Sequence, residues 1–165
     1  VVEGPYVYAG GGFTDAGGNP NADYIARWDG SSWNALGSGL NYNVYAIVVE
    51  GPNVYVGGYF WDAGGNANAD SIARWDGSSW YALGSGLNDY VFAIAVEGAD
   101  VYVAGAFSDA GGDANADRVA RWNGSQWEPA ATGGNTDGHG PTRTHTDGRT
   151  DDGTAPPLST RGHMV

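Results

Sequence analysis

Short apolar stretches alternate with polar, glycine-rich stretches along the first 130 residues, and the same order returns at a fixed interval. Residues 44–50 (VYAIVVE) are apolar almost throughout, which is typical of a strand buried on both faces. Asp76-Gly77, a dipeptide favoured in hairpins, joins two further short strands. The four strands predicted for one unit span residues 44–50, 54–60, 72–75 and 79–83. A polar loop, residues 61–71, separates the second strand from the third.

The interval between units is 47 residues, so the segment that starts at Glu3 returns at Glu50 and again at Glu97. The aromatic residues that keep this phase are Phe13, Phe60 and Phe107, then Trp28, Trp75 and Trp122, then Trp33, Trp80 and Trp127. Four antiparallel strands in a period of roughly 40 to 50 residues indicate a β-propeller blade, because β-helix rungs are much shorter and sandwiches do not repeat so strictly. We therefore predict an all-β chain with four-stranded antiparallel blades at about residues 1–43, 44–90 and 91–130.

The repeat resembles the Kelch and galactose-oxidase-like propeller repeat, in which a double glycine precedes two spaced aromatic residues. Here these are Gly57-Gly58, Trp75 and Trp80, whereas the third copy departs with Ala104-Gly105. The units also look like the GGxF…ARWDG…W…LGSGL repeats of long bacterial and fungal surface proteins. The resemblance implies a propeller that binds other proteins more often than it catalyses, and an extracellular or cell-surface location if the chain is natural. The copper ligands of galactose oxidase have no counterpart, because no His lies inside the repeats.

Three blades are too few to close a ring, since propellers have roughly four to eight. The first blade also lacks most of its innermost strand, because the equivalents of residues 44–47 would precede Val1. Each blade buries its aromatic face against neighbours on both sides. We therefore expect a closed homo-oligomer, either a homodimer with six blades or a homotrimer with nine. An open array of copies is the alternative.

Composition limits the partners. The chain carries a net charge of −12 with no lysine, which disfavours nucleic acid and anionic membrane surfaces as partners. It has no cysteine, so it forms no disulfide or thiolate metal site.

The near-identity of the copies indicates recent duplication or deliberate design. The only methionine is Met164, which leads us to expect a fragment, a processed product or an engineered chain.

Residues 131–165 differ sharply from the repeats. This stretch is rich in Gly, Thr, Asp and Pro and contains no aromatic residue, so we predict a disordered or vector-derived tail. Its three histidines are too scattered to predict a metal site.

The loop between the second and third strands carries oxygen ligands at alternating positions. In the third copy these are Asp109, Asp113, Asn115 and Asp117, which form a candidate calcium site. The order does not match an EF-hand. The alternative is that these side chains cap turns through hydrogen bonds to the backbone.

Trp61 is the candidate ligand-binding residue, because its equivalents are Thr14 and Ser108 and the fold does not require a large ring there. Such a residue could contact a carbohydrate or a protein. The tryptophans with fixed phase are instead expected to pack between blades. The repeated Arg27, Arg74 and Arg121 are expected to pair with carboxylates such as Asp29, Asp76 or Glu50.

Catalysis has little support in the repeats. They contain no G-x-S-x-G motif and no His that could serve as a general base. A carboxylate pair could serve glycoside hydrolysis, yet nothing distinguishes one pair among nineteen acidic residues. We expect a structural, self-assembling propeller module without catalytic activity of its own. A ligand-binding propeller is the alternative, and a hydrolase is the third hypothesis.

Overall fold

The computed structural model describes residues 1–130. The predicted tail, residues 131–165, and its histidines lie outside the described residues.

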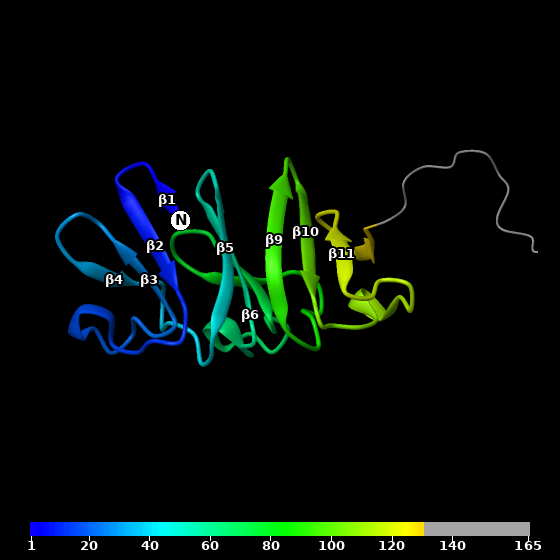
Figure 1. The fold of residues 1–165 in the computed structure, drawn as a ribbon, viewed down its shortest axis with the longest axis horizontal. Helices are drawn as coiled ribbons and strands as arrows, with labels where there is room; N and C mark the ends of the chain where they lie inside the picture. Colours follow the sequence, from blue (N-terminus) through cyan, green and yellow to red (C-terminus); the bar gives the residue numbers. More distant parts are fainter. Residues whose placement is uncertain (131–165) are drawn as a thin grey trace, which may run out of the picture. The chain divides into compact units, whose positions relative to one another are not determined.

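The described chain forms three four-stranded antiparallel sheets, in which strands adjacent in sequence are hydrogen-bonded neighbours (Figure 1). Blade 1 consists of β1 (Val2–Glu3), β2 (Tyr6–Gly10), β3 (Ile25–Trp28) and β4 (Trp33–Ala35). Blade 2 consists of β5 (Val44–Glu50), β6 (Asn53–Gly58), β7 (Ile72–Trp75) and β8 (Trp80–Ala82). Blade 3 consists of β9 (Val91–Glu97), β10 (Asp100–Gly105), β11 (Val119–Trp122) and β12 (Trp127–Pro129). The predicted all-β fold with four-stranded propeller-like blades is confirmed, and strand ends shift by at most two residues.

Each loop between the second and third strands of a blade contains one short 3₁₀ turn. These turns are η1 (Ala16–Gly18), η2 (Ala63–Gly65) and η3 (Ala110–Gly112). Among the described residues, no helix has the length and apolar character that a membrane crossing requires.

The hydrophobic core lies between blades. Ile25 and Leu36 of blade 1 are buried in one cluster with Val56 and Phe60 of blade 2. The second cluster repeats this arrangement one period later, joining Ile72 and Leu83 of blade 2 to residues of blade 3 that include Val103 and Phe107. Blade 2 contributes to both clusters, so a neighbouring blade covers each face of its sheet.

The first residue of the double glycine allows two blades to approach closely. A Cβ atom at Gly57 would lie 2.5 Å from Cγ1 of Val91 on the innermost strand of the next blade. Gly10 meets Val44 in the same way. Any larger residue at these two positions would force neighbouring blades apart. In the third blade Ala104 replaces this glycine, and no further blade follows within residues 1–130.

Candidate functional site

Tryptophans on the outermost strands join one blade to the one before it. The indole Nε1 of Trp80 donates to the carbonyl oxygen of Leu36 at 3.0 Å, and Trp127 donates to Leu83 at 2.8 Å. Both side chains are buried, with only 7% and 5% of their surface exposed. A buried indole N–H needs an acceptor, and here the neighbouring blade supplies it. The predicted packing of these tryptophans between blades is confirmed at both junctions.

Trp33 holds the same position in blade 1 but lacks this environment. It is half-buried, and no acceptor is bonded to its indole N–H within the described residues. Its ring still pairs with Trp28, with centroids 5.5 Å apart, as Trp75 pairs with Trp80 at 5.3 Å. Among residues 1–130, blade 1 therefore presents a formed tryptophan pair that no preceding blade covers.

A second group of aromatic residues lies at the end of the blades where the innermost strands begin. We call it the aromatic surface; it consists of Tyr24, Tyr42, Tyr45, Tyr59, Trp61, Tyr90 and Phe92. Tyr59 and Tyr90 stack with their ring centroids 4.1 Å apart, and Tyr42 stacks on Trp61 at 5.9 Å. Burial raises the pKa of the Tyr90 phenol, and the neighbouring Tyr59 adds to the shift. The Tyr90 hydroxyl therefore stays protonated at neutral pH.

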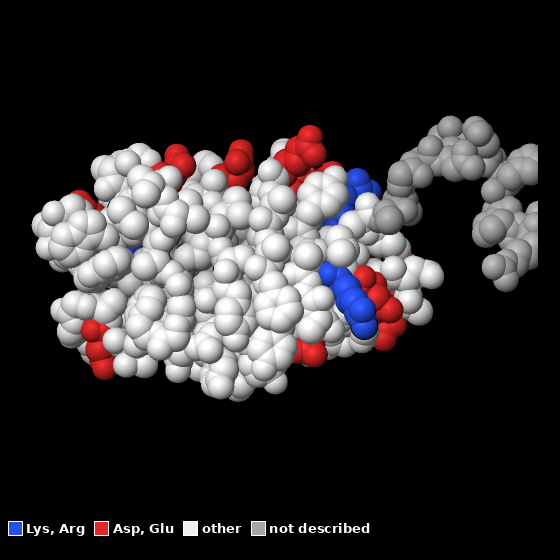
Figure 2. Space-filling model, viewed as in Figure 1, with Lys and Arg blue, Asp and Glu red and all other residues white. Residues whose placement is uncertain are grey.

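The aromatic surface remains accessible to solvent. Trp61 exposes 44% of its surface, and Tyr42, Tyr45 and Phe92 are also exposed. On the face seen in Figure 2, the surface over the middle of β5 is uncharged, and most acidic side chains lie near the upper and lower margins. Exposed, contiguous aromatic surface of this kind is a candidate site of interaction.

The backbone at Trp61 follows the repeat, but the side chain does not. Asn41 accepts a hydrogen bond from the Trp61 N–H at 3.1 Å and donates to its carbonyl oxygen at 2.8 Å. One period later, Asn88 contacts Ser108 in a similar way: it accepts a hydrogen bond from the Ser108 N–H at 3.0 Å and donates one to the Ser108 hydroxyl. The fold thus fixes the main chain at this position, while the ring of Trp61 packs against Tyr42 and Tyr59 and remains accessible to a ligand.

Most other rings of the aromatic surface also occupy positions that vary between repeats. Tyr42 corresponds to Asp89, and Tyr59 corresponds to Ala106. Sequence reasoning singled out Trp61 and missed its neighbours. Comparing every varied position across the three copies would have found them.

The candidate calcium loop uses its oxygens for turns. Asp117 Oδ1 accepts from the backbone N–H of Asp109 at 2.8 Å, and Asp113 Oδ1 accepts from the N–H of Asn115 at 2.9 Å. The first bond recurs in both other loops, including Asp62 to Asp70 at 2.8 Å. Within residues 1–130 no three acidic or His side chains gather as a metal site would need. The contacts favour the turn-capping alternative, and calcium binding stays a prediction.

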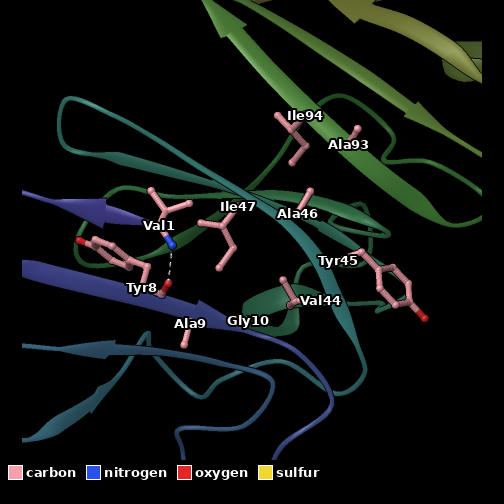
Figure 3. Close-up of a pocket in the computed structure, with 10 residues that line it drawn as sticks. All are labelled: Val1, Tyr8, Ala9, Gly10, Val44, Tyr45, Ala46, Ile47, Ala93 and Ile94. Atoms are coloured by element: carbon pink, nitrogen blue, oxygen red, sulfur yellow. Dashed lines mark hydrogen bonds between the residues drawn. The ribbon is translucent and has the colours of Figure 1, made fainter.

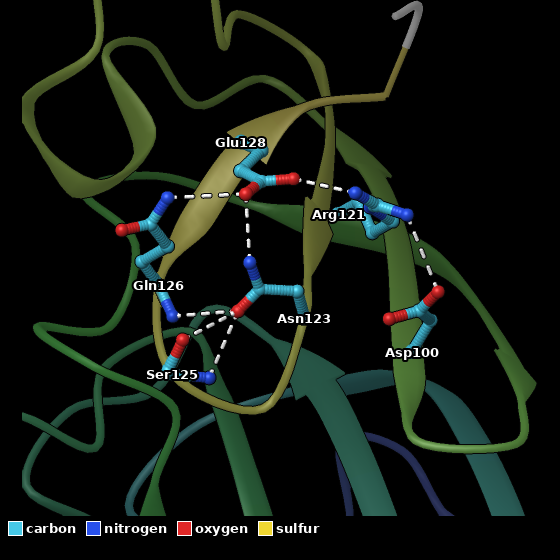
Figure 4. Close-up of polar contacts among 6 residues, drawn as sticks. All are labelled: Asp100, Arg121, Asn123, Ser125, Gln126 and Glu128. Atoms are coloured by element: carbon cyan, nitrogen blue, oxygen red, sulfur yellow. Dashed lines mark hydrogen bonds and ion pairs between the residues drawn. The ribbon is translucent and has the colours of Figure 1, made fainter. Parts of the chain in front are cut away.

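The repeated arginines differ in their partners. Arg121 forms ion pairs with Glu128 and with Asp100, the latter at 3.3 Å (Figure 4). Hydrogen bonding to this guanidinium lowers the pKa of Glu128. Arg27 and Arg74 instead lie over aromatic rings: Arg27 sits 4.4 Å from the ring centre of Tyr6, and Arg74 sits 4.8 Å from that of Tyr81. The expected pairing with a carboxylate is therefore confirmed for Arg121, although its partners are Glu128 and Asp100, and is wrong for Arg27 and Arg74. The reason is that the residue opposite each arginine differs between blades.

The hairpin between the third and fourth strands of each blade is closed by one side chain. Asp76 accepts hydrogen bonds from the backbone N–H groups of Ser78 and Ser79, which lower its pKa to about 2. Asp29 is held in the same way, and the N–H of Ser32 is the largest cause of its lowered pKa. Asn123 fills this role in blade 3. Carboxyl pKa values shifted downward suit structural acceptors, whereas a general acid needs a raised pKa.

No protein-family model matches the sequence, and comparison with curated proteins gives no match.

Proposed function

We propose that this chain is a structural module that assembles with copies of itself into a closed β-propeller ring and has no catalytic activity of its own. The proposal rests on Trp33, whose indole N–H has no hydrogen-bond acceptor within the described residues. Two junctions within the chain bury an indole and bond its N–H to the preceding blade, and Trp33 offers the same half of a third junction.

The other half of that junction would come from blade 3 of a second copy. Ala130 follows β12 at the position that Leu36 and Leu83 hold in the other blades. Its carbonyl oxygen is thus the equivalent acceptor for the indole of Trp33. Contact between the first blade of one copy and the last blade of another is head-to-tail, and such contacts close into rings when the rotation per copy allows. Two copies give six blades, which lies in the usual propeller range, and three copies give nine.

The experiment is to replace Trp33 and measure the mass of the assembly in solution. Trp33→Ala should shift the mass from a multiple of the 17.1 kDa subunit toward the single subunit while the circular dichroism spectrum stays unchanged. Ala130→Leu restores the side chain of the other two repeats and should tighten the assembly, because it fills the site that Leu36 fills at the first junction. An assembly of unchanged mass and affinity in both variants would contradict the proposed junction.

The aromatic surface supports a second candidate function, the binding of a carbohydrate. Flat, uncharged rings with hydroxyl groups suit the apolar faces of a sugar ring, while the tyrosine hydroxyls can bond its polar edge. Trp61 is the residue we expect to contribute most, because its side chain is exposed and unconstrained by the repeat.

A glycan array, followed by titration of any hit, tests this second function. Trp61→Ser places the residue of the third blade, Ser108, at the same backbone position, so the fold should be retained. We expect binding to fall at least tenfold in this variant. An array without any hit, or a hit that binds Trp61→Ser equally well, would remove the carbohydrate hypothesis.

A further inference from the structure

Arg121 of blade 3 is flanked by two carboxylates that blade 2 lacks. Asp100 pairs with it from β10 and Glu128 pairs with it from β12, on either side of β11 (Figure 4). One period of 47 residues earlier, Asn53 stands at the position of Asp100, and Tyr81 stands at the position of Glu128. The arginine of blade 2 therefore lies between two uncharged side chains.

That arginine, Arg74, is half-buried, and its guanidinium carbon lies 4.8 Å from the centre of the Tyr81 ring. Within residues 1–130, Arg121 forms ion pairs with carboxylates and Arg74 forms none. A guanidinium stays charged at neutral pH, and one that lies over an aromatic ring still offers N–H groups at its edge. Arg74 thus holds a positive charge that no carboxylate of the described chain offsets.

A pocket of about 410 Å³ opens beside Arg74, between blades 2 and 3. Asn53, Tyr55 and Tyr81 provide its other polar side chains, and Trp122 provides an aromatic wall. Among residues 1–130, no acidic side chain lines this pocket. An anion in the pocket would therefore meet a cation and several hydrogen-bond donors without a competing carboxylate.

The junction between blades 1 and 2 carries the same pocket in a smaller form. Each of its lining residues lies one period before a residue of the pocket at Arg74, and the arginine there is Arg27. Its volume is only about 70 Å³, and the larger Pro52 stands at the position of Ala99. The Nε of Arg27 is buried without a hydrogen-bond partner in the described chain. Of the two pockets, only the one at Arg74 has room for an organic ligand.

The largest groove of the described chain differs in its chemistry. It has a volume of about 530 Å³ and runs beside β5, where Val44, Ile47 and Ile94 are among its lining residues (Figure 3). No charged side chain of residues 1–130 lines it. An anionic ligand therefore has a cationic side chain to bind at Arg74 and has none beside β5.

Two sources of negative charge bear on the pocket at Arg74. The whole chain carries a net charge of −12, but exposed charges more than about 10 Å away are largely screened at about 0.1 M salt. Asp76 lies between Arg74 and Tyr81 in sequence, and its Oδ1 already accepts hydrogen bonds from the N–H groups of Ser78 and Ser79. A single carboxylate at Arg74 is therefore compatible with the acidic composition of the chain.

We propose that the pocket at Arg74 binds an acidic sugar, a hexuronate, through a salt bridge between the ligand carboxylate and the guanidinium. Glu128 in blade 3 is the template for this carboxylate, since a planar guanidinium can hold a carboxylate through two N–H groups. The pocket is much larger than a carboxylate group. Its Trp122 ring suits the apolar face of a sugar, while Asn53 and the tyrosine hydroxyls suit the hydroxyl groups.

This pocket is separate from the aromatic surface. Gly98, which follows the last residue of β9, lines the pocket, whereas Tyr90 of the aromatic surface directly precedes the first residue of that strand. The two sites therefore lie at opposite ends of β9. The pocket also lies at a junction within one chain, so the proposal does not depend on assembly of copies.

Titration with D-glucuronate, followed by NMR, tests the proposal, with D-glucose as the neutral comparison. The parent chain should bind glucuronate at least about tenfold more tightly than glucose, because only glucuronate carries the carboxylate. Arg74→Gln removes the cation and should weaken glucuronate binding at least about tenfold. The matched control is Arg27→Gln, which removes the equivalent arginine at the smaller pocket and should leave the affinity unchanged.

A second variant blocks the site while it keeps the arginine. Tyr81→Glu combined with Asp76→Asn copies the residues of blade 3, Glu128 and Asn123, so the fold should be retained and Arg74 should pair within the chain. Glucuronate binding should again fall at least about tenfold. Asp76→Asn alone should bind glucuronate at least as well as the parent.

Four results would overturn the proposal: equal affinity for glucuronate and glucose, no binding of either sugar, full affinity in Arg74→Gln or in the double variant, or loss of affinity in Arg27→Gln. Trp61→Ser, on the aromatic surface, should bind glucuronate as the parent does. This proposal and the carbohydrate hypothesis for the aromatic surface therefore fail separately.

Discussion

Trp127 of blade 3 donates its indole N–H to the carbonyl oxygen of Leu83 in blade 2 at 2.8 Å. The two residues are 44 positions apart, nearly one repeat, and Trp80 makes the same bond to Leu36. Because the bond crosses from one sheet to the next, it links units that share no strand pairing. Each junction combines this bond with burial of a large ring, and the two junctions therefore stabilise the packing of each blade against the one before it.

Replacing Trp80 should therefore affect the chain differently from replacing Trp33. Trp80→Ala removes a buried ring and should lower the free energy of unfolding by about 3–5 kcal/mol. Trp33→Ala removes a half-buried ring and should leave subunit stability nearly unchanged, while it weakens assembly by about 2 kcal/mol or more. Chemical denaturation measures the first effect, and the dependence of mass on concentration measures the second. Equal loss of subunit stability in both variants would show that Trp33 is an ordinary core residue.

Gly57 tests the close approach of blades 2 and 3. Gly57→Ala places a Cβ atom against Val91 and should cost about 1–3 kcal/mol of unfolding free energy. Val91→Ala alone should also lower the unfolding free energy, because Val91 is fully buried. It should cost less in the Gly57→Ala chain than in the parent, because it removes the atom that the new Cβ meets. The matched control is Ala104→Gly at the equivalent position of blade 3, which should cost no more than about 1 kcal/mol. Denaturation curves of the parent, the single variants and the double variant would contradict this reasoning if the losses from Gly57→Ala and Val91→Ala simply added in the double variant.

The hairpin aspartates predict a defined response to acid. The pKa of Asp76 falls from its ordinary 3.8 to about 2 in the folded chain, and that of Asp29 falls in the same direction. A carboxyl with a depressed folded pKa stabilises the fold above its ordinary pKa, and this contribution is lost as the pH falls from 3.8 towards 2. Asp29→Asn with Asp76→Asn should flatten the decline of the thermal midpoint between pH 4 and pH 2, since Asn123 already fills this role in blade 3.

At neutral pH the asparagine variant should melt close to the parent chain. The opposite result, a decline with acid as steep as in the parent, would assign the acid response to other groups.

Substitution of Asp117 distinguishes turn capping from calcium binding. Asp117→Ala removes the acceptor for the Asp109 N–H and should lower the unfolding free energy by about 1–3 kcal/mol with a chelator present. Asp117→Asn keeps an acceptor oxygen and should lose less. Added calcium should leave the thermal midpoint of the parent chain unchanged. A midpoint that rises with calcium concentration in the parent, and not in Asp117→Ala, would restore the metal site.

The periodic features of the chain are those that sequence reasoning anticipated. A fixed interval places Trp33, Trp80 and Trp127 on equivalent strands, so the blade boundaries and the packing between blades follow from the sequence. The partners of the arginines did not follow, because Arg74 and Arg121 share a strand position but face Tyr81 and Glu128 on the next strand. The residue on the opposing strand determines the partner of each arginine, and that residue differs between repeats.

The aromatic surface shows the same limit. Tyr59 follows β6 and Tyr90 directly precedes β9, 31 positions later, yet their rings stack at 4.1 Å. No local pattern links them, since each stands where the other repeats have a different residue.

The mass of the unmodified chain in solution tests the central claim most directly. Light scattering or native mass spectrometry at micromolar concentration should give two or three times the 17.1 kDa of one subunit. A compact, soluble species of 17.1 kDa alone at that concentration would contradict the account, since it would mean that the exposed junction at Trp33 needs no partner.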